Sequence, residues 1–140
     1  MRLLILSLML FMLAGCATSA VQINAAKQVP EDRLFIKDNT DGNAVITIIR
    51  DSGLLGSACN INVFINDELA ATLDVSEKAT FNVKAGEIYL GAQFSGNGLC
   101  INSSIRNLET SIKQAQHKTY RVYSDPSGNM QILANGMVKN

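Results

Sequence analysis

The chain has 140 residues, and its 12 basic and 12 acidic side chains give a formal net charge of zero. This balance, with no cluster of basic residues, excludes the positively charged surface that nucleic-acid binding requires. The length is sufficient for one domain with a hydrophobic core after a short N-terminal leader is removed.

Residues 1–15 are predicted to be a cleaved signal peptide. Arg2 precedes an apolar stretch from Leu3 to Ala14, which is too short to span a membrane and has the length of a signal-peptide core. The stretch ends at Leu13-Ala14-Gly15-Cys16, which looks like the lipobox of bacterial lipoproteins. That resemblance implies cleavage before Cys16, a diacylglycerol on its thiol and a further acyl chain such as palmitate on its amine.

Two alternatives remain for this stretch: an ordinary cleaved signal and a core helix. The ordinary signal needs no cysteine, and the core helix would show a polar face that Leu3 to Ala14 lacks. Ala17 follows the cysteine, where lipoproteins retained at the inner membrane of enteric bacteria often have Asp. The expected location is therefore the periplasmic face of the outer membrane, with the inner membrane or the cell surface as alternatives.

Residues 16–32 are predicted to be the lipidated N-terminus and a flexible tether. They are mostly small and polar, and they contain one proline. Residues 33–140 are then expected to form the folded domain.

From about Leu34 the sequence shows the two-residue alternation of β-strands. In "NINVFIN" the apolar residues Ile61, Val63 and Ile65 alternate with asparagines, whereas "AVITIIR" at 44–50 is uniformly apolar, as in a central strand. Further strands are expected at 79–83, 87–94, 118–124 and 130–134. Asn66-Asp67 and "SDPSGN" at 124–129 are typical of tight turns. The pattern predicts an all-β fold, an antiparallel β-sandwich of immunoglobulin or transthyretin type.

Residues 104–116 are ambiguous. Ile105, Leu108 and Ile112 have helical spacing, but Leu108, Thr110 and Ile112 also alternate as in a strand. The strand is the preferred interpretation.

Cys59 and Cys100 are predicted to form a disulfide. With Cys16 assigned to lipid, they are the remaining two cysteines, and the periplasm is oxidising. The bridge would close a loop of about forty residues and contribute roughly 4 kcal/mol. The alternative is two separate buried thiols.

Four segments resemble a known family: "IIRDSG", "GSACNINVFINDELAATL", "FNVKAGEIYLGA" and "HKTYRVYSDPSGNMQIL". The family comprises small bacterial lipoproteins with a domain of unknown function, related to PEGA-like and transthyretin-like sandwiches. Asp67 stands where the family commonly has a glycine, and Ala85 where it often has a proline. The resemblance implies the sandwich fold and the envelope location, and no catalytic residues.

No catalytic or metal-binding pattern stands out. His117 is the only histidine, and an exposed histidine at the start of a strand is the expected interpretation. The segment "KDNTDGN" places Asp38 and Asp41 near a glycine, but Lys37 and Ile48 stand where an EF-hand loop has its key acids. No G-x-S-x-G or H-E-x-x-H motif occurs. We expect no enzyme activity, no metal and no cofactor.

The function expected from the sequence is that of a lipid-anchored, non-catalytic accessory or interaction module with a protein partner in the cell envelope. The alternative is a module that binds a small molecule or a cell-wall glycan. The sequence has few aromatic residues and no tryptophan, which disfavours stacking of sugars. The oligomeric state, the partner and the ligand stay open.

Overall fold

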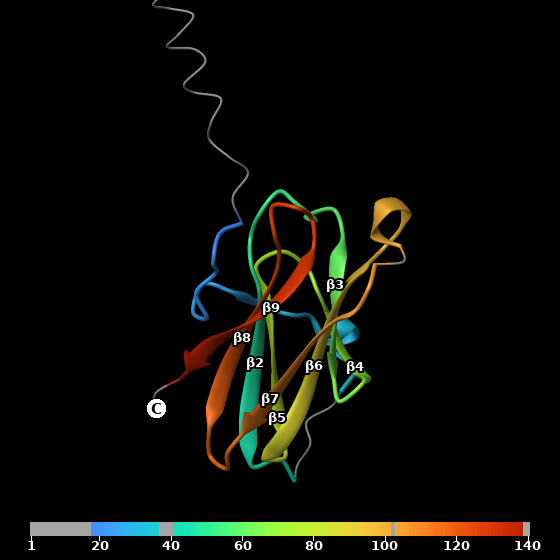
Figure 1. Cartoon of the computed structure of the whole chain (residues 1–140). Coiled ribbons are helices and arrows are strands. Elements are labelled where there is room, and N and C mark those ends of the chain that lie inside the picture. Colours follow the sequence, from blue (N-terminus) through green and yellow to red (C-terminus); the bar gives the residue numbers. More distant parts are fainter. Residues whose placement is uncertain (1–17, 37–40, 102, 139–140) are drawn as a thin grey trace, which may run out of the picture.

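The computed structural model describes residues 18–36, 41–101 and 103–138, and it is a sandwich of two β-sheets (Figure 1). The five-stranded sheet has the order β1-β5-β2-β8-β9 and the four-stranded sheet the order β4-β3-β6-β7. The strands are β1 (Lys27–Gln28), β2 (Ala44–Arg50), β3 (Asn60–Ile65), β4 (Glu68–Leu73), β5 (Glu77–Val83), β6 (Gly86–Ser95), β7 (Arg106–Ile112), β8 (His117–Ser124) and β9 (Met130–Met137). Two 3-10 turns complete it, η2 (Glu31–Arg33) and η3 (Gly98–Cys100). The all-β sandwich prediction is confirmed.

The hydrophobic core lies between the sheets and is built by the alternating residues. Ile61, Val63 and Ile65 of β3 are buried, and the intervening residues are more exposed. The same alternation buries the predicted inward-facing residues of β5, β6 and β8, among them Phe81, Leu90 and Tyr120. Burying a large apolar side chain stabilises the fold by about 1.5–3 kcal/mol, so these strands define the sandwich.

The strand pairing differs from a purely antiparallel sandwich in two places. β2 pairs with β8 in parallel, in the register Val45↔His117 to Arg50↔Val122, and β1 pairs with β5 in parallel. Parallel neighbours need a long crossover connection. β2 and β8 have one, because the whole four-stranded sheet lies between them in the chain. β2 is a central strand, as its uniformly apolar sequence predicted.

The ambiguous segment 104–116 contains a strand. β7 pairs antiparallel with β6, and the register Leu90↔Leu108 places both leucines at the same level of the sandwich. Ile112 is buried and Leu108 half-buried, whereas Glu109 is exposed. Sheet pairing therefore selects the two-residue alternation over the helical spacing.

The predicted flexible tether lies against the domain over its described part. Ser19 forms a β-bridge with Ser52, the Lys78 ammonium donates to the Ile23 carbonyl at 2.6 Å, and Val29 is buried. The prediction of a tether was based on the small and polar side chains of this segment. Its backbone N–H and C=O groups bond to the domain instead, and backbone groups of this kind are present at nearly every residue.

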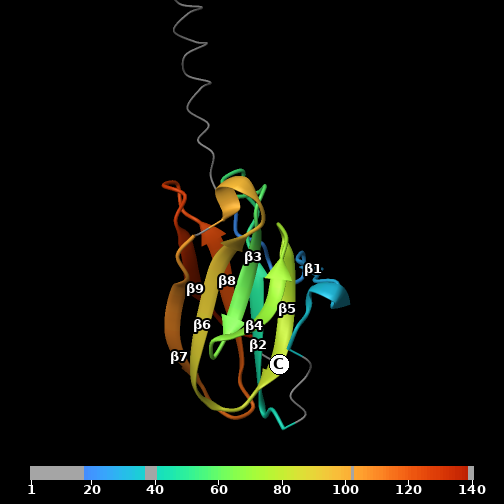
Figure 2. The same cartoon turned by 90° about the vertical axis from the view of Figure 1, so that its right-hand side faces the viewer.

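The N-terminal segment covers one side of the sandwich and leaves the other side open (Figure 2). β1 pairs with the edge of β5, and Leu34 then bridges to Ala71 at the edge of β4. Arg33 links the same two strands, because its guanidinium donates to the Thr72 carbonyl and pairs with Glu77 at 2.6 Å. On the opposite side, β7 and β9 are edge strands with no second strand neighbour among the described residues.

Candidate functional site

The candidate site is the end of the sandwich at which the described chain begins, together with the open side next to it. Four connections lie at this end: 51–59 between β2 and β3, 74–76 between β4 and β5, 96–105 between β6 and β7, and 125–129 between β8 and β9 (Figure 1). We call this the loop end.

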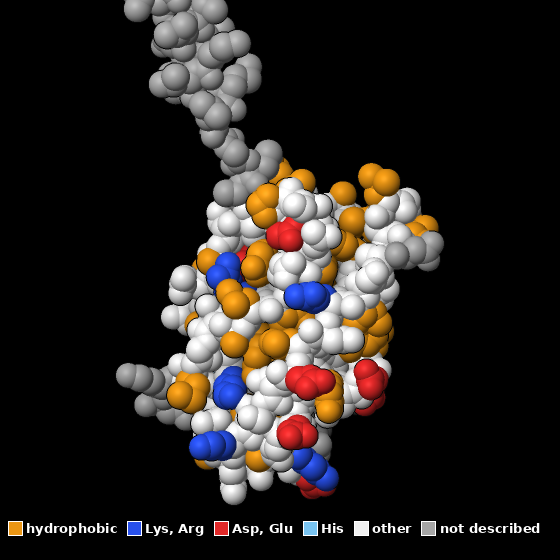
Figure 3. All heavy atoms as spheres, viewed as in Figure 1, with side chains coloured by type: hydrophobic (Ala, Val, Ile, Leu, Met, Phe, Trp, Pro, Cys, Tyr) orange, Lys and Arg blue, Asp and Glu red, His pale blue; other side chains and the backbone are white. Residues whose placement is uncertain are grey.

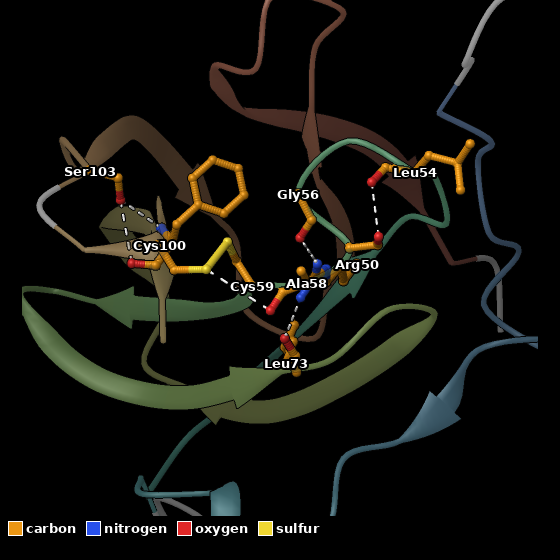
Figure 4. The surroundings of a disulfide bond; sticks show 10 residues. Arg50, Leu54, Gly56, Ala58, Cys59, Leu73, Cys100 and Ser103 are labelled. Carbon is orange, nitrogen blue, oxygen red and sulfur yellow. Dashed lines mark hydrogen bonds between the residues drawn. A yellow bond between two sulfur atoms is a disulfide. The ribbon is translucent and has the colours of Figure 1, made fainter. Parts of the chain in front are cut away.

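A disulfide joins two of these connections. Cys59 and Cys100 are bonded, with their Cα atoms 5.5 Å apart and a sequence separation of 41. The predicted pairing is confirmed, and both cysteines are buried. The Cys100 sulfur also lies 3.9 Å from the Ala58 carbonyl oxygen (Figure 4). The bridge therefore fixes the 96–105 loop beside the 51–59 loop.

Arg50, the last residue of β2, bonds to backbone groups of the same region. The side chain is almost completely buried, and its guanidinium donates to the carbonyl oxygens of Leu73 at 2.9 Å and Gly56 at 2.8 Å (Figure 4). Burial lowers the pKa of Arg50, which Asp74 and Glu77 partly offset through their charges. Because the ordinary pKa of arginine lies far above neutral pH, the group stays charged at pH 7. Arg50 thus ties the 51–59 loop to the end of β4.

Asp51 and Arg121 form an ion pair that also holds the N-terminal segment. The Arg121 Nε donates to both carboxylate oxygens of Asp51 at 3.0 Å, and the Val21 backbone N–H donates to the same carboxylate at 3.2 Å. The Asp51 side chain is fully buried. The hydrogen bond to Asp51 raises the pKa of Arg121. Its guanidinium also lies 5.7 Å from the Tyr123 ring centroid, within the range of a cation–π contact.

The first described residues contact the loop end directly. The Thr18 hydroxyl donates to the Ser124 carbonyl at 2.8 Å, and Ser19 and Ser52 exchange backbone hydrogen bonds of 2.7 and 3.1 Å. The chain therefore joins the domain next to the 51–59 loop. Cys16, the predicted lipidation site, lies outside the described residues.

His117 is the first residue of β8. It is half-buried, whereas the sequence predicted an exposed histidine. Its Nε2 lies 2.8 Å from the Thr47 hydroxyl, which also bonds the Thr80 hydroxyl at 2.9 Å. Burial lowers the pKa of His117 below its ordinary value. A threonine next to a histidine has the geometry of a nucleophile and its base, but Thr47 is buried and already shared with Thr80. The arrangement is that of a polar bridge across β5, β2 and β8.

Two grooves border the open side. The first, near the loop end, has a volume of ≈ 500 Å³ and is lined mainly by residues 103–106 and 128–131. The second, at the far end, has ≈ 380 Å³ and is mostly apolar, with Tyr120, Ala134 and Met137 in its wall. In the wall of the second groove, the Tyr120 and Thr110 hydroxyls bond across the two sheets at 2.9 Å. The open side is thus hollowed at both ends.

Within the ranges that the structure describes, no three His, Cys, Asp or Glu side chains gather as metal ligands. The same ranges contain no helix of the length and apolarity that crossing a membrane requires. Asp38 of the rejected calcium pattern lies outside them.

Sequence reasoning missed the buried charges at the loop end. Arg50 ends the apolar strand β2 and Asp51 follows it, and ionisable residues are seldom fully buried unless paired. The one indication in the sequence was that these two residues directly follow the apolar segment "AVITII". The groups that pair with them, Arg121 and the Leu73 carbonyl, are distant in the sequence, so no local pattern points to them.

The chain matches no family model and no curated protein.

Proposed function

We propose that the protein is a lipid-anchored, non-catalytic interaction module of the bacterial cell envelope, attached through Cys16 and facing the periplasm at the outer membrane. The Leu13–Cys16 sequence and the resemblance to small bacterial lipoproteins support the anchor. Two acyl chains or more hold a protein durably on a bilayer, whereas one alone binds marginally.

The observation that carries the interaction role is the unequal protection of the sheet edges. The N-terminal segment covers the edges of β5 and β4, whereas β7 and β9 have no strand beyond them in the described ranges. An edge strand presents unpaired backbone groups to which a partner strand can bind. β9 also exposes apolar side chains, with Leu133 47% and Met137 63% accessible. These features suit a protein partner that adds to β9.

Site-specific photo-crosslinking in cells tests this role. A crosslinker at Leu133 on β9 should capture one dominant envelope protein. The matched control is Phe35, which is equally exposed at 48% but lies on the covered side. With the crosslinker kept at Leu133, Met137→Lys, which puts a charge on the same exposed strand, should abolish the product without unfolding the domain. Equal products from Leu133 and Phe35, or none from Leu133, would contradict the proposal.

Intact mass tests the anchor separately. The protein extracted from membranes should carry acyl mass on a chain that begins at Cys16, and Cys16→Ala should carry none. A membrane-extracted protein without acyl mass would refute the anchor and leave the crosslinking result unaffected.

The groove of ≈ 500 Å³ favours a second candidate, the binding of a small molecule or a cell-wall fragment. Its lining includes Ser103, Ser104, Asn129 and Gln131, which supply hydrogen-bonding groups. A thermal-shift screen with cell-wall fragments tests it, because a ligand at 100 times its Kd stabilises the folded state by about 2.7 kcal/mol. A screen without shifts would count against this candidate.

A further inference from the structure

Four exposed apolar side chains lie at the loop end, two in each of the loops that the disulfide joins. Leu54 and Leu55 belong to the 51–59 loop and are 73% and 38% accessible. Leu99 and Ile101 belong to the 96–105 loop and are 103% and 54% accessible. We call these four residues the apolar tip. Figure 3 shows hydrophobic side chains at this upper end of the molecule.

Next to the tip residues neither loop has an exposed charge, because Asp51, the only charged residue of the 51–59 loop, is buried in its ion pair with Arg121. Residues 52–58 read "SGLLGSA" and residues 96–105 read "GNGLCINSSI". Solvent-exposed loops in soluble proteins usually carry polar and charged residues, and clustered apolar exposure marks an interaction surface. The tip can therefore enter an apolar environment without removing an ion from water.

Hydrogen bonds and the disulfide fix the backbone of the two loops that carry the tip. The Ser57 hydroxyl and the Ser57 N–H both bond to the Leu54 carbonyl, at 2.8 and 3.2 Å, and Arg50 holds the Gly56 carbonyl. The disulfide fixes the two loops side by side, and Leu54 points away from it (Figure 4). A preformed apolar surface loses little conformational entropy when it binds.

The predicted lipid attachment point lies close to the tip. Only Ala17 separates Cys16 from Thr18, so the Cα atoms of Cys16 and Thr18 are at most about 7 Å apart. Thr18 bonds to Ser124 and lies against Gly53, where an added Cβ would be 3.1 Å from the Thr18 Cα. Gly53 immediately precedes Leu54. A lipid on Cys16 therefore enters the bilayer beside the tip.

On this basis, which rests on the proposed lipid anchor, we infer that the apolar tip inserts into the surface of the membrane that holds the anchor. Leu54, Leu55, Leu99 and Ile101 reach the boundary between headgroups and acyl chains. The neighbouring turn at Asp125 stays in the headgroup layer, because its carboxylate is bonded to the N–H groups of Ser127 and Asn129 and remains charged. The strands then stand away from the membrane, and the open side with β7 and β9 faces along it.

Single tryptophans test this insertion, because the chain has none of its own. Leu54→Trp and Leu99→Trp place a reporter in each loop, at exposed positions where a larger side chain meets solvent. Tyr89→Trp is the control, because Tyr89 is 47% exposed on β6 and its carbonyl bonds the Asn66–Asp67 turn at the opposite end. The acylated full-length variants are placed in phosphatidylethanolamine–phosphatidylglycerol vesicles, with or without brominated acyl chains. Circular dichroism checks the fold, and intact mass checks the acylation.

Brominated lipid should quench the two tip tryptophans by about half, since interfacial side chains penetrate about 5–10 Å, and it should leave Tyr89→Trp unchanged. Acylated protein whose tip tryptophans are quenched no more than the control would overturn the inference and leave the anchor standing. A blue-shifted emission without bromine quenching would mean that a second copy of the chain covers the tip, and would also overturn it. Absence of acyl mass would overturn the anchor, and the inference with it.

Discussion

Removing the Cys59–Cys100 disulfide should destabilise the domain by about 4 kcal/mol. The bridge closes a loop of 41 residues, and the lost loop-closure entropy for that length corresponds to ~4 kcal/mol at 25 °C. Domains of this size are stable by about 5–15 kcal/mol in total. The bridge is therefore a large share of the stability, equivalent to about 10–20 °C in Tm.

The assay is denaturant unfolding of three samples: oxidised wild type, reduced wild type, and the double variant Cys59→Ala and Cys100→Ala. Alanine is preferred over serine because both positions are buried and a hydroxyl there would need a hydrogen-bond partner. The reduced wild type and the double variant should agree closely, and both should unfold at lower denaturant than the oxidised protein. A reductant should have no effect on the double variant.

A loss below about 1 kcal/mol in both the reduced wild type and the double variant would refute this reasoning, because it would mean that the unfolded chain gains little freedom when the bridge is cut. A loss confined to the double variant would assign the effect to side-chain packing instead of the crosslink.

Three further changes test other parts of the structure. Asp51→Ala should destabilise the domain by about 2–3 kcal/mol in denaturant unfolding, because Arg121 and the Val21 N–H lose a buried partner. Asp67→Gly should stabilise it by up to about 1 kcal/mol, because Asp67 has a φ of 66° in the β3–β4 turn, where glycine is favoured. His117→Gln should remove a pH dependence of stability. The pKa of His117 is lowered from 6.5 by burial, so as the pH falls below about 6.5 the unfolded wild type takes up a proton before the folded one does. Wild type should therefore lose stability relative to His117→Gln in that range and run parallel to it above pH 7.

Each of these has a clear contradicting result. For Asp51→Ala it is a loss below about 0.5 kcal/mol, the size of an ordinary surface substitution. For Asp67→Gly it is a lower unfolding midpoint than that of the wild type. For His117→Gln it is a constant difference between the two proteins from pH 5 to pH 8.

Much of the fold could be predicted from local patterns. The alternation in "NINVFIN" correctly identified Ile61, Val63 and Ile65 as buried, and Asn66 and Asp67 do adopt positive φ in the turn that follows. The disulfide could be predicted as well, because only two cysteines remained once Cys16 was set aside. At 104–116 two periodicities overlapped, and only pairing with β6 selected the strand.

The candidate site was much less accessible to prediction. The predicted disulfide joined Cys59 to Cys100, but the local spacing gave no sign that Leu54 and Leu55 would be exposed at the same end of the sandwich as Leu99 and Ile101. That placement requires the two sheets to bring residues about 45 positions apart to one end, where the disulfide joins their loops. The ion pair of Asp51 with Arg121 depends in the same way on the parallel pairing of β2 with β8.

The amino-acid sequence by itself determined most of the strands and which face of each is buried, because a two-residue alternation and turn residues act within a few positions. The exceptions are β1, which lies in the predicted tether, and β7, which pairing with β6 selected. Only the tertiary structure decided which strands are neighbours, which sheet edges are covered and where the chain after Cys16 joins the domain. The covering of β5 and β4 by residues 27–36 relies largely on backbone hydrogen bonds. Backbone groups are the same at nearly every residue, so the sequence does not mark which of them will pair, and their choice of partner depends on the assembled sandwich.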